Sequence, residues 1–360
     1  MKNVLWASAV IGIALLSCGG GDGAGVVGGV SEYLGTASVG DFLKVSVDHA
    51  THTITYQNLT NGQQGTVPYS LASDGGFDIQ DPQGNLVRGY EIPNFAVVLE
   101  VHNAGPNQDT SCLAFAVQQA PLDVAGLVSK KFNFMQFRTK SGGMEVGNAQ
   151  MSNGVLNTEN FWPYGAMNGG QSFNSGSMST DDWQLHASGT YWIVPGDGNA
   201  PDYIFGTPSG VLAIDTPNGN IIALEQQSSK NLLPERAGTY KAICYLKDDA
   251  IMTQGGQEVG TLEVGKATIV VTVNSHISVW NESGDLLVDT DLVPVADQAY
   301  LVGAGKLTDP CHGLFTFRVT DNGEDTDVFV TFIEGAILFS SFAPGTGSQY
   351  DYLYGVGLQS

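Results

Sequence analysis

The sequence has few charged residues, and very few of these are positive. Only 14% of its 360 residues are charged, and 14 Lys and Arg stand against 36 Asp and Glu, for a formal net charge of −22. A chain this acidic repels the phosphates of nucleic acids, so we expect no nucleic-acid partner. The acidic residues occur singly or in pairs rather than in blocks of about five or six, which predicts a solvated acidic surface.

Long apolar runs are missing after the first residues of the chain. The one extended apolar stretch, residues 4–17, is 14 residues long, whereas a membrane-spanning helix needs about 20. No later window approaches the roughly 18 consecutive apolar residues of such a helix. We therefore expect no transmembrane helix.

Catalytic and metal-binding motifs are also missing. The sequence contains no G-x-S-x-G, no S-x-x-K and no phosphate-binding glycine loop. His49 and His52 flank one turn, but zinc requires three or four ligands. Asp321, Asp325 and Asp327 miss the spacing of an EF-hand loop. We therefore expect no metal site and no cofactor.

Glycine and short alternating runs dominate the rest of the sequence. The 47 glycines are about twice the usual share of roughly 7%. In residues 43–48 and 53–56, on either side of a turn, apolar side chains take every second position, which predicts a β-hairpin with one buried face. Similar runs recur about every ten residues, which is typical of a sandwich or barrel. These runs are residues 66–71, 77–80, 86–92, 95–102 and 112–118.

The patterns predict an all-β fold of antiparallel sandwich or barrel modules, two or three in number, with few or no long helices. We expect a β module over residues 31–120 and a larger β region over residues 129–360, with a further division near residue 230 left open. Short helices at residues 124–131 or 220–233 stay open, because short apolar runs are ambiguous.

Two short stretches recur with weak similarity. The run EVGNA at residues 145–149 resembles EVGKA at residues 263–267, and VSVD at residues 45–48 resembles VTVN at residues 271–274. A duplicated β module of about 90 to 120 residues explains this recurrence, and so does independent reuse of the same hairpin chemistry.

The beginning of the chain carries a recognisable targeting pattern. Residues 15–21 read LLSCGGG and follow the short apolar stretch and the positive Lys2. This pattern resembles the signal peptide and lipobox of bacterial lipoproteins. The resemblance implies that residues 1–17 are removed and that Cys18 becomes the acylated first residue, for instance carrying palmitate. Stable anchoring requires more than one acyl chain, which this modification supplies.

The same resemblance implies a location. Residues 18–30 become a lipidated cysteine with a flexible glycine-rich tether, and the lipid on Cys18 makes the membrane a partner. Asp22 is not adjacent to Cys18, which resembles lipoproteins that are sent on to the outer membrane. We therefore expect a bacterial cell-envelope protein, anchored by lipid in the outer membrane.

Cysteines are few. Besides Cys18, the chain has Cys112, Cys244 and Cys311. Disulfides form outside the cytoplasm, and three thiols cannot all pair. We expect a Cys244–Cys311 disulfide because both residues lie in the last third of the chain. Burial of free thiols as small apolar groups is the alternative.

Residues 157–183 combine five aromatic residues with Asn, Gly and Ser and contain no basic residue. Little periodicity predicts a long loop, and long loops inside compact domains are usually functional. Aromatic rings suit sugar faces and protein partners, so we take Phe161, Trp162 and Tyr164 as candidate ligand-binding residues. The alternative is a lid whose aromatic residues pack on the core.

Three functions follow as hypotheses. The leading one is a surface-anchored lipoprotein with a non-catalytic role, either binding a glycan or protein partner or supporting the envelope. The second is a secreted hydrolase of an extracellular polymer, because 36 acidic residues could supply a carboxylate pair in any fold. The third is a β-barrel carrier of a small apolar ligand. The missing catalytic motifs favour a non-enzymatic role.

Overall fold

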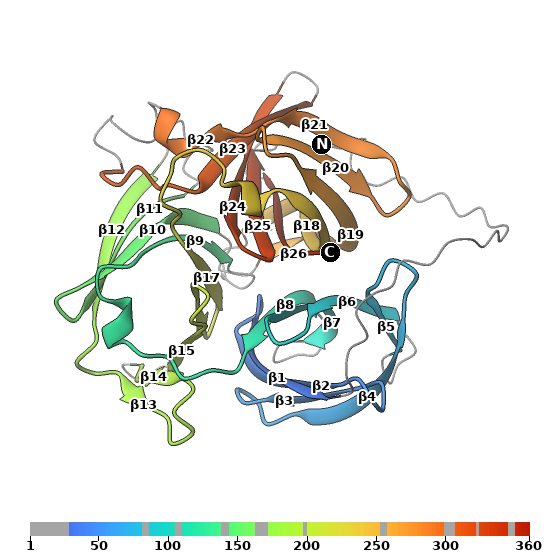
Figure 1. Cartoon of the computed structure of the whole chain (residues 1–360), viewed down its shortest axis with the longest axis vertical. Coiled ribbons are helices and arrows are strands. Elements are labelled where there is room, and N and C mark those ends of the chain that lie inside the picture. Colours follow the sequence, from blue (N-terminus) through green and yellow to red (C-terminus); the bar gives the residue numbers. More distant parts are fainter. Residues whose placement is uncertain are drawn as a thin grey trace, which may run out of the picture.

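The protein is an antiparallel all-β molecule, which confirms the predicted fold class. The computed structural model describes residues 29–80, 86–104, 110–137, 144–162, 172–196, 200–252, 258–298, 307–321, 324–344 and 350–360. Helical structure in these residues is limited to the short 3₁₀ turns η1 (Ala125–Leu127), η3 (Pro234–Arg236) and η4 (Val295–Asp297). The strands form three sheets, each from one continuous stretch of chain, and the sheets lie side by side around a common centre (Figure 1).

The first unit is a closed eight-stranded barrel in which each strand pairs with the next and β1 pairs with β8. Its strands are β1 (Val30–Ala37), β2 (Asp41–Asp48), β3 (Thr53–Asn58), β4 (Gln64–Leu71), β5 (Phe77–Gln80), β6 (Leu86–Ile92), β7 (Ala96–Ala104) and β8 (Thr110–Gln118).

The second unit is a nine-stranded sheet with the order β12-β11-β10-β9-β17-β16-β15-β14-β13. Its strands are β9 (Lys131–Phe137), β10 (Met144–Ser152), β11 (Val155–Trp162), β12 (Ser172–Ser179), β13 (Gln184–Leu185), β14 (Trp192–Val194), β15 (Asp202–Gly206), β16 (Val211–Thr216) and β17 (Gly219–Glu225).

The third unit is a nine-stranded sheet with the order β21-β20-β19-β18-β26-β25-β24-β23-β22. Its strands are β18 (Gly238–Met252), β19 (Glu258–Val271), β20 (His276–Asn281), β21 (Leu286–Asp291), β22 (Val293–Pro294), β23 (Leu314–Asp321), β24 (Glu324–Ile333), β25 (Ala336–Pro344) and β26 (Tyr350–Gln359). Strands β19 and β20 pair as an antiparallel hairpin.

The two nine-stranded sheets have the same topology. In each, the first strand pairs with the last, and the sheet is open between its fourth and fifth strands. Directions alternate in an antiparallel ring, so a closed ring needs an even number of strands. Eight strands close, whereas in a set of nine the fourth and fifth strands run in the same direction. In the third unit only Leu292 separates β21 from β22, so these two are one strand divided between the two edges of the opening.

The second and third strands of every unit also share a buried asparagine. A cross-strand pair of these two strands contains a buried asparagine in all three units; counted from the turn that joins the strands, it is the sixth pair in the first and second units and the fifth pair in the third. These pairs are Leu43–Asn58, Gly147–Asn160 and Ala267–Asn281. Because the position differs by one pair in the third unit, both explanations of the recurrence, a duplicated module and independent reuse of hairpin chemistry, stay open.

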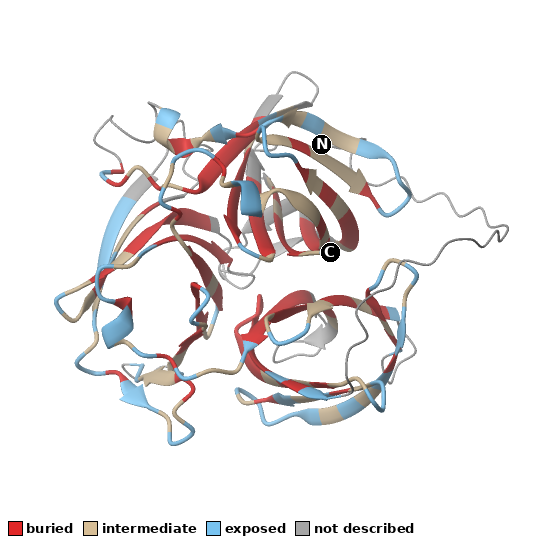
Figure 2. Cartoon of the chain, in the orientation of Figure 1, coloured by how far each residue is buried: buried red, intermediate tan, exposed pale blue. Residues whose placement is uncertain are grey.

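Four apolar cores hold the molecule together. Three fill the interiors of the units, and the fourth and largest lies between the units (Figure 2). Across this central core Phe42 stacks on Tyr203 with ring centroids 4.5 Å apart, and Phe137 stacks on Tyr354 at 4.9 Å. Strands that face the centre are therefore buried on both sides.

Polar contacts also join the units. Lys266 of the third unit lies 3.2 Å from a carboxylate oxygen of Asp74 in the first, and its Nζ is 5.4 Å from the ring centroid of Tyr90. Between the second and third units, Lys131 contacts Asp309 at 2.5 Å. Burial raises the pKa of Asp309, but hydrogen bonds from Lys131, Gln226 and the Cys311 amide outweigh it and hold this pKa below its usual value.

Candidate ligand-binding cavity

The lipidation site lies outside the described residues, as do the signal peptide and most of the tether. Lipidation of Cys18 therefore stays a prediction. No helix among the described residues is long and apolar enough to cross a membrane.

The predicted loop at residues 157–183 is wrong over much of its length. Here β11 and β12 pair along eight residue positions, and β12 is an edge strand of its sheet. Phe161 and Trp162 belong to β11, but their side chains lie outside the described part, and so does Tyr164. Their role in binding stays a prediction. Trp183 is buried in the interior core of the second unit, as expected for a lid residue.

The predicted Cys244–Cys311 disulfide is also wrong. Cys112, Cys244 and Cys311 are all free, buried thiols. Cys244 faces the interior of the third unit, whereas Cys311 packs in the central core between the units. Because the two side chains belong to different cores, they do not meet. Burial raises the pKa of the Cys244 thiol to about 12, so it is neutral.

The two histidines at the β2–β3 turn have different neighbours. His49 Nε2 lies 3.4 Å from the Glu91 carboxylate, and the His52 ring lies beside Tyr69. Glu91 accepts a hydrogen bond from Tyr33. The described residues contain no group of three or more His, Cys, Asp or Glu side chains placed to hold a metal ion.

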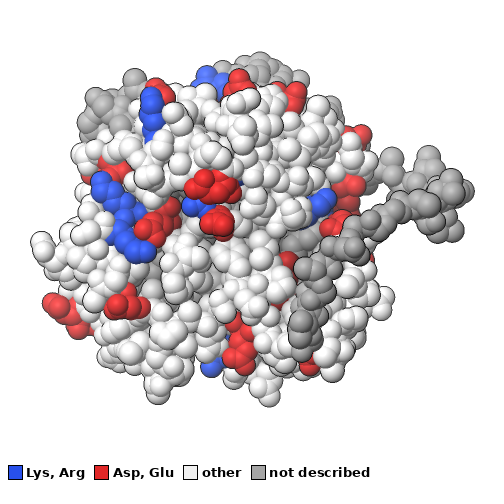
Figure 3. Space-filling model, in the orientation of Figure 1, with Lys and Arg blue, Asp and Glu red and all other residues white. Residues whose placement is uncertain are grey.

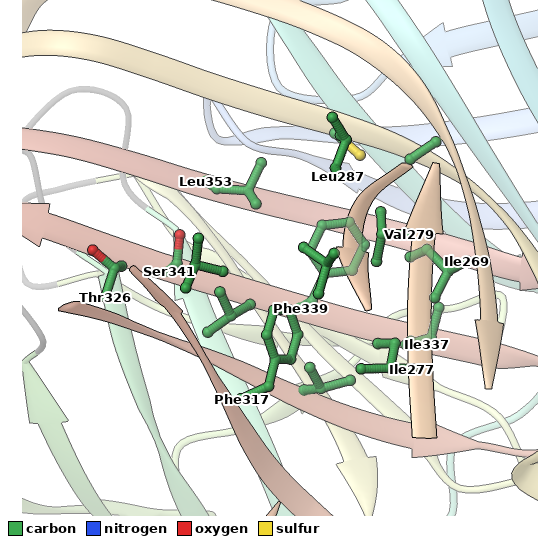
Figure 4. Close-up of a pocket in the computed structure, with 16 residues that line it drawn as sticks. Ile269, Ile277, Val279, Leu287, Phe317, Thr326, Ile337, Phe339, Ser341 and Leu353 are labelled. Carbon is green, nitrogen blue, oxygen red and sulfur yellow. The ribbon is translucent and has the colours of Figure 1, made fainter. Parts of the chain in front are cut away.

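The candidate site is a cavity inside the third unit. Its volume is about 80 Å³, and 16 side chains line it (Figure 4). The lining comes from every long strand of the unit, β18 to β21 and β23 to β26. On β24 and β25 it consists of alternate residues, because side chains of a strand point in turn to the inside and the outside of a barrel. These residues are Thr326, Val328, Val330, Ile337, Phe339 and Ser341.

Aromatic side chains close the interior beyond one end of the cavity. Phe332 packs against Tyr240 and Phe315, with ring centroids 6.1 and 5.7 Å apart. Leu232, from the segment that links the second and third units, belongs to the same core. None of these four residues lines the cavity, so they separate it from that end of the unit.

The lining is apolar and carries no charge. All 16 residues are uncharged, and the polar groups among them are the Thr326 and Ser341 hydroxyls and the Cys244 thiol. Both hydroxyls lie at one end, and Ile277 and Ile337 lie at the other (Figure 4). On the outer surface, Figure 3 shows charged side chains in small groups on one face of the molecule.

The cavity borders the opening of the third sheet. Leu287 and Val288 line it from β21, on one side of the opening, and Phe317 and Val319 line it from β23, near the other side. Leu286, next to Leu287, is exposed. An apolar edge of this kind suits the entry of an apolar molecule.

Sequence reasoning did not find this cavity. Alternation in residues 326–330 and 337–341 marks which side chains face inward. Whether inward-facing side chains fill the space depends on the summed volumes of residues from eight strands. Small residues such as Ala267 and Ser341 at inward positions are the one local signal, and it is weak.

Comparison with known proteins assigns no family. No protein-family model matches the chain, and no curated protein matches it. Among solved structures, isotype 1 transferrin binding protein B from serogroup B Neisseria meningitidis aligns at 11% identity and a TM-score of 0.25, over 89% of this chain and 66% of that one. Intact Ap-TbpB, with its N and C lobes, aligns at 10% identity and a TM-score of 0.24, over 93% and 78%. The chain thus spans just under two thirds of the first of these proteins, and TM-scores this low carry no functional assignment.

Proposed function

We propose that this protein is a lipid-anchored, non-catalytic binding protein of the bacterial cell envelope, and that the interior of its third unit takes up a small apolar ligand. The apolar cavity inside β18–β26 carries this proposal. It combines the leading functional hypothesis with the barrel-carrier hypothesis. The anchor part of the proposal depends on the lipobox resemblance at Cys18.

The energetics of the cavity support a ligand. Protein interiors are close-packed, and an empty cavity costs about 24 cal/mol per Å³. A cavity of about 80 Å³ therefore destabilises the empty protein by on the order of 2 kcal/mol. An apolar ligand restores the missing contacts, whereas water gains little from walls that offer it few polar partners.

The size of the cavity limits the ligand. At roughly 10–15 Å³ for each water-sized group, there is room for about five to eight methylene-sized groups. Burial of each contributes about 0.8 kcal/mol, which gives roughly 4–6 kcal/mol before the costs of association. Because the costs of association reduce this gain, tens of micromolar is the tightest dissociation constant expected for a ligand of this size.

The experiment that tests the proposal is extraction of the purified protein with organic solvent, followed by mass spectrometry, and titration of extracted protein with benzene. Ala267→Leu places a larger side chain in the cavity. Ala114→Leu is the matched control, because Ala114 is an equally buried alanine in the interior of the first unit. We expect Ala267→Leu to abolish benzene binding and Ala114→Leu to retain it. Absence of benzene binding to the extracted wild-type protein contradicts the proposal.

A further inference from the structure

We infer that the ligand of this cavity is neutral and amphipathic: a short hydrocarbon chain that ends in a hydrogen-bonding group such as a hydroxyl, with that group held by Thr326 and Ser341. The inference rests on the proposed function, which it deepens by naming the chemical class of the ligand. Three features of the cavity carry it: the position of the two hydroxyls, the apolar character of the remaining lining, and the absence of charge among the lining residues.

The register of the third sheet brings the two hydroxyls together. Val328 on β24 pairs with Ser341 on β25. Thr326 is two residues from Val328 and so faces the same side of the sheet. Thr326 and Ser341 are therefore diagonal neighbours across two adjacent strands, within reach of one small polar group. Figure 4 shows both at the same end of the cavity.

The end of the cavity that carries the Thr326 and Ser341 hydroxyls is more polar than the rest of the lining. Each hydroxyl has one donor and two acceptor positions, and both residues are buried, Thr326 at 7% and Ser341 at 3% exposed. Both residues line the cavity, where a ligand can reach their hydroxyls. A ligand hydroxyl or carbonyl at this end supplies a partner for both side chains, and its hydrocarbon chain then lies toward Ile269, Ile277 and Ile337.

The charge of the ligand follows from the same lining. None of the 16 lining residues is a Lys, Arg or His. A carboxylate that enters this cavity loses its hydration and meets no cation among these 16 lining residues, which is a large penalty. The net charge of −22 also repels anions from the molecule as a whole. Neutral alcohols, aldehydes and esters avoid both penalties.

The test uses three probes of similar size on the extracted full-length protein at pH 7.5: benzene, 1-hexanol and hexanoate. The variants are Ser341→Ala and Thr326→Val, each of which removes one hydroxyl. Ser340→Ala is the matched control, because Ser340 is adjacent and buried, is not part of the lining, and has an Oγ without a hydrogen-bond partner. Binding is measured by calorimetry or by the ligand-induced rise in unfolding temperature, and folding of each variant by circular dichroism.

We expect the wild-type protein to bind benzene and 1-hexanol but to bind hexanoate at least about 100-fold more weakly than 1-hexanol. Ser341→Ala and Thr326→Val each weaken 1-hexanol binding by roughly 2- to 12-fold, the range for one hydrogen bond, and leave benzene binding equal or tighter. Ser340→Ala changes neither. Having two variants keeps the test decisive if one does not fold.

The failures are distinguishable. If benzene binds but both variants retain full affinity for 1-hexanol, the assigned polar end is wrong and the proposed function stands. If hexanoate binds as tightly as 1-hexanol, the ligand is not restricted to neutral molecules. If neither benzene nor 1-hexanol binds, the proposed function itself is wrong.

Discussion

Replacement of Ala267 by leucine tests the cavity through the stability of the empty protein. Ala267 lies on β19, is buried and lines the cavity. Leucine adds three carbon atoms, whose burial contributes about 0.8 kcal/mol each. The strain of fitting a branched side chain opposes this gain and costs about 1–3 kcal/mol where the core has no free space.

Whether leucine raises or lowers the free energy of unfolding depends on the free space beside the substituted alanine. With about 80 Å³ available, the added atoms meet little strain, and we expect Ala267→Leu to raise the free energy of unfolding by about 1–2 kcal/mol. The same change at Ala114, in the interior of the first unit, is expected to lower it by about 1–3 kcal/mol. Urea denaturation of both variants measures the difference. If Ala267→Leu destabilises the protein as much as Ala114→Leu does, the argument from empty space is refuted.

Three further predictions concern other parts of the chain. Burial raises the pKa of Glu91 above 4.5, although its contacts with Tyr33 and His49 act in the opposite direction. Between the pKa values of the unfolded and folded states, the folded protein therefore holds a proton on Glu91 that the unfolded chain releases. The free energy of unfolding falls as pH rises through this interval. We therefore expect the free energy of unfolding of Glu91→Gln, relative to wild type, to be higher at pH 7.5 than at pH 4 in urea denaturation. An equal difference at both pH values contradicts this. Cys18→Ala is expected to lose incorporation of a palmitate analogue, and full labelling of this variant would overturn the anchor. Trp162→Ala with Tyr164→Ala is expected to weaken capture of a glycan or protein partner without unfolding the protein, and loss of folding would show that these residues are core.

The strands that are buried on one face were predictable from the sequence. The predicted runs at residues 77–80 and 86–92 coincide with β5 and β6, because a half-buried strand alternates polar and apolar side chains. Strands that face the central core are harder to read. In β18 residues 240–246 are apolar but for Lys241, and all but this one are buried, so their alternation is lost and the partner strands stay unknown.

No local sequence pattern predicts which strands pair to close each unit. Pairing of β1 with β8, or of β18 with β26, joins strands about 100 residues apart, and neither sequence run contains a signal for the other. The repeats at residues 145–149 and 263–267 do fall on second strands, β10 and β19. Equating the buried-asparagine pairs matches Gly147 with Ala267, which differs by two residues from the sequence alignment.

The errors have physical causes. Residues 157–183 have few β-favouring side chains, yet β11 and β12 pair there, because ladder hydrogen bonds do not require an alternating pattern. The disulfide prediction placed Cys244 and Cys311 in one module, but residues on opposite faces of a strand or sheet enter different cores. Sequence proximity within a module does not show which face a side chain occupies.

The most direct test of the binding cavity is diffraction from crystals of the extracted protein under xenon pressure. Xenon enters dry apolar cavities, so the account predicts a xenon peak among Ile269, Val279 and Phe339, which disappears in Ala267→Leu. Crystals that show no xenon there, or show ordered water or protein side chains in the same space, would contradict the account.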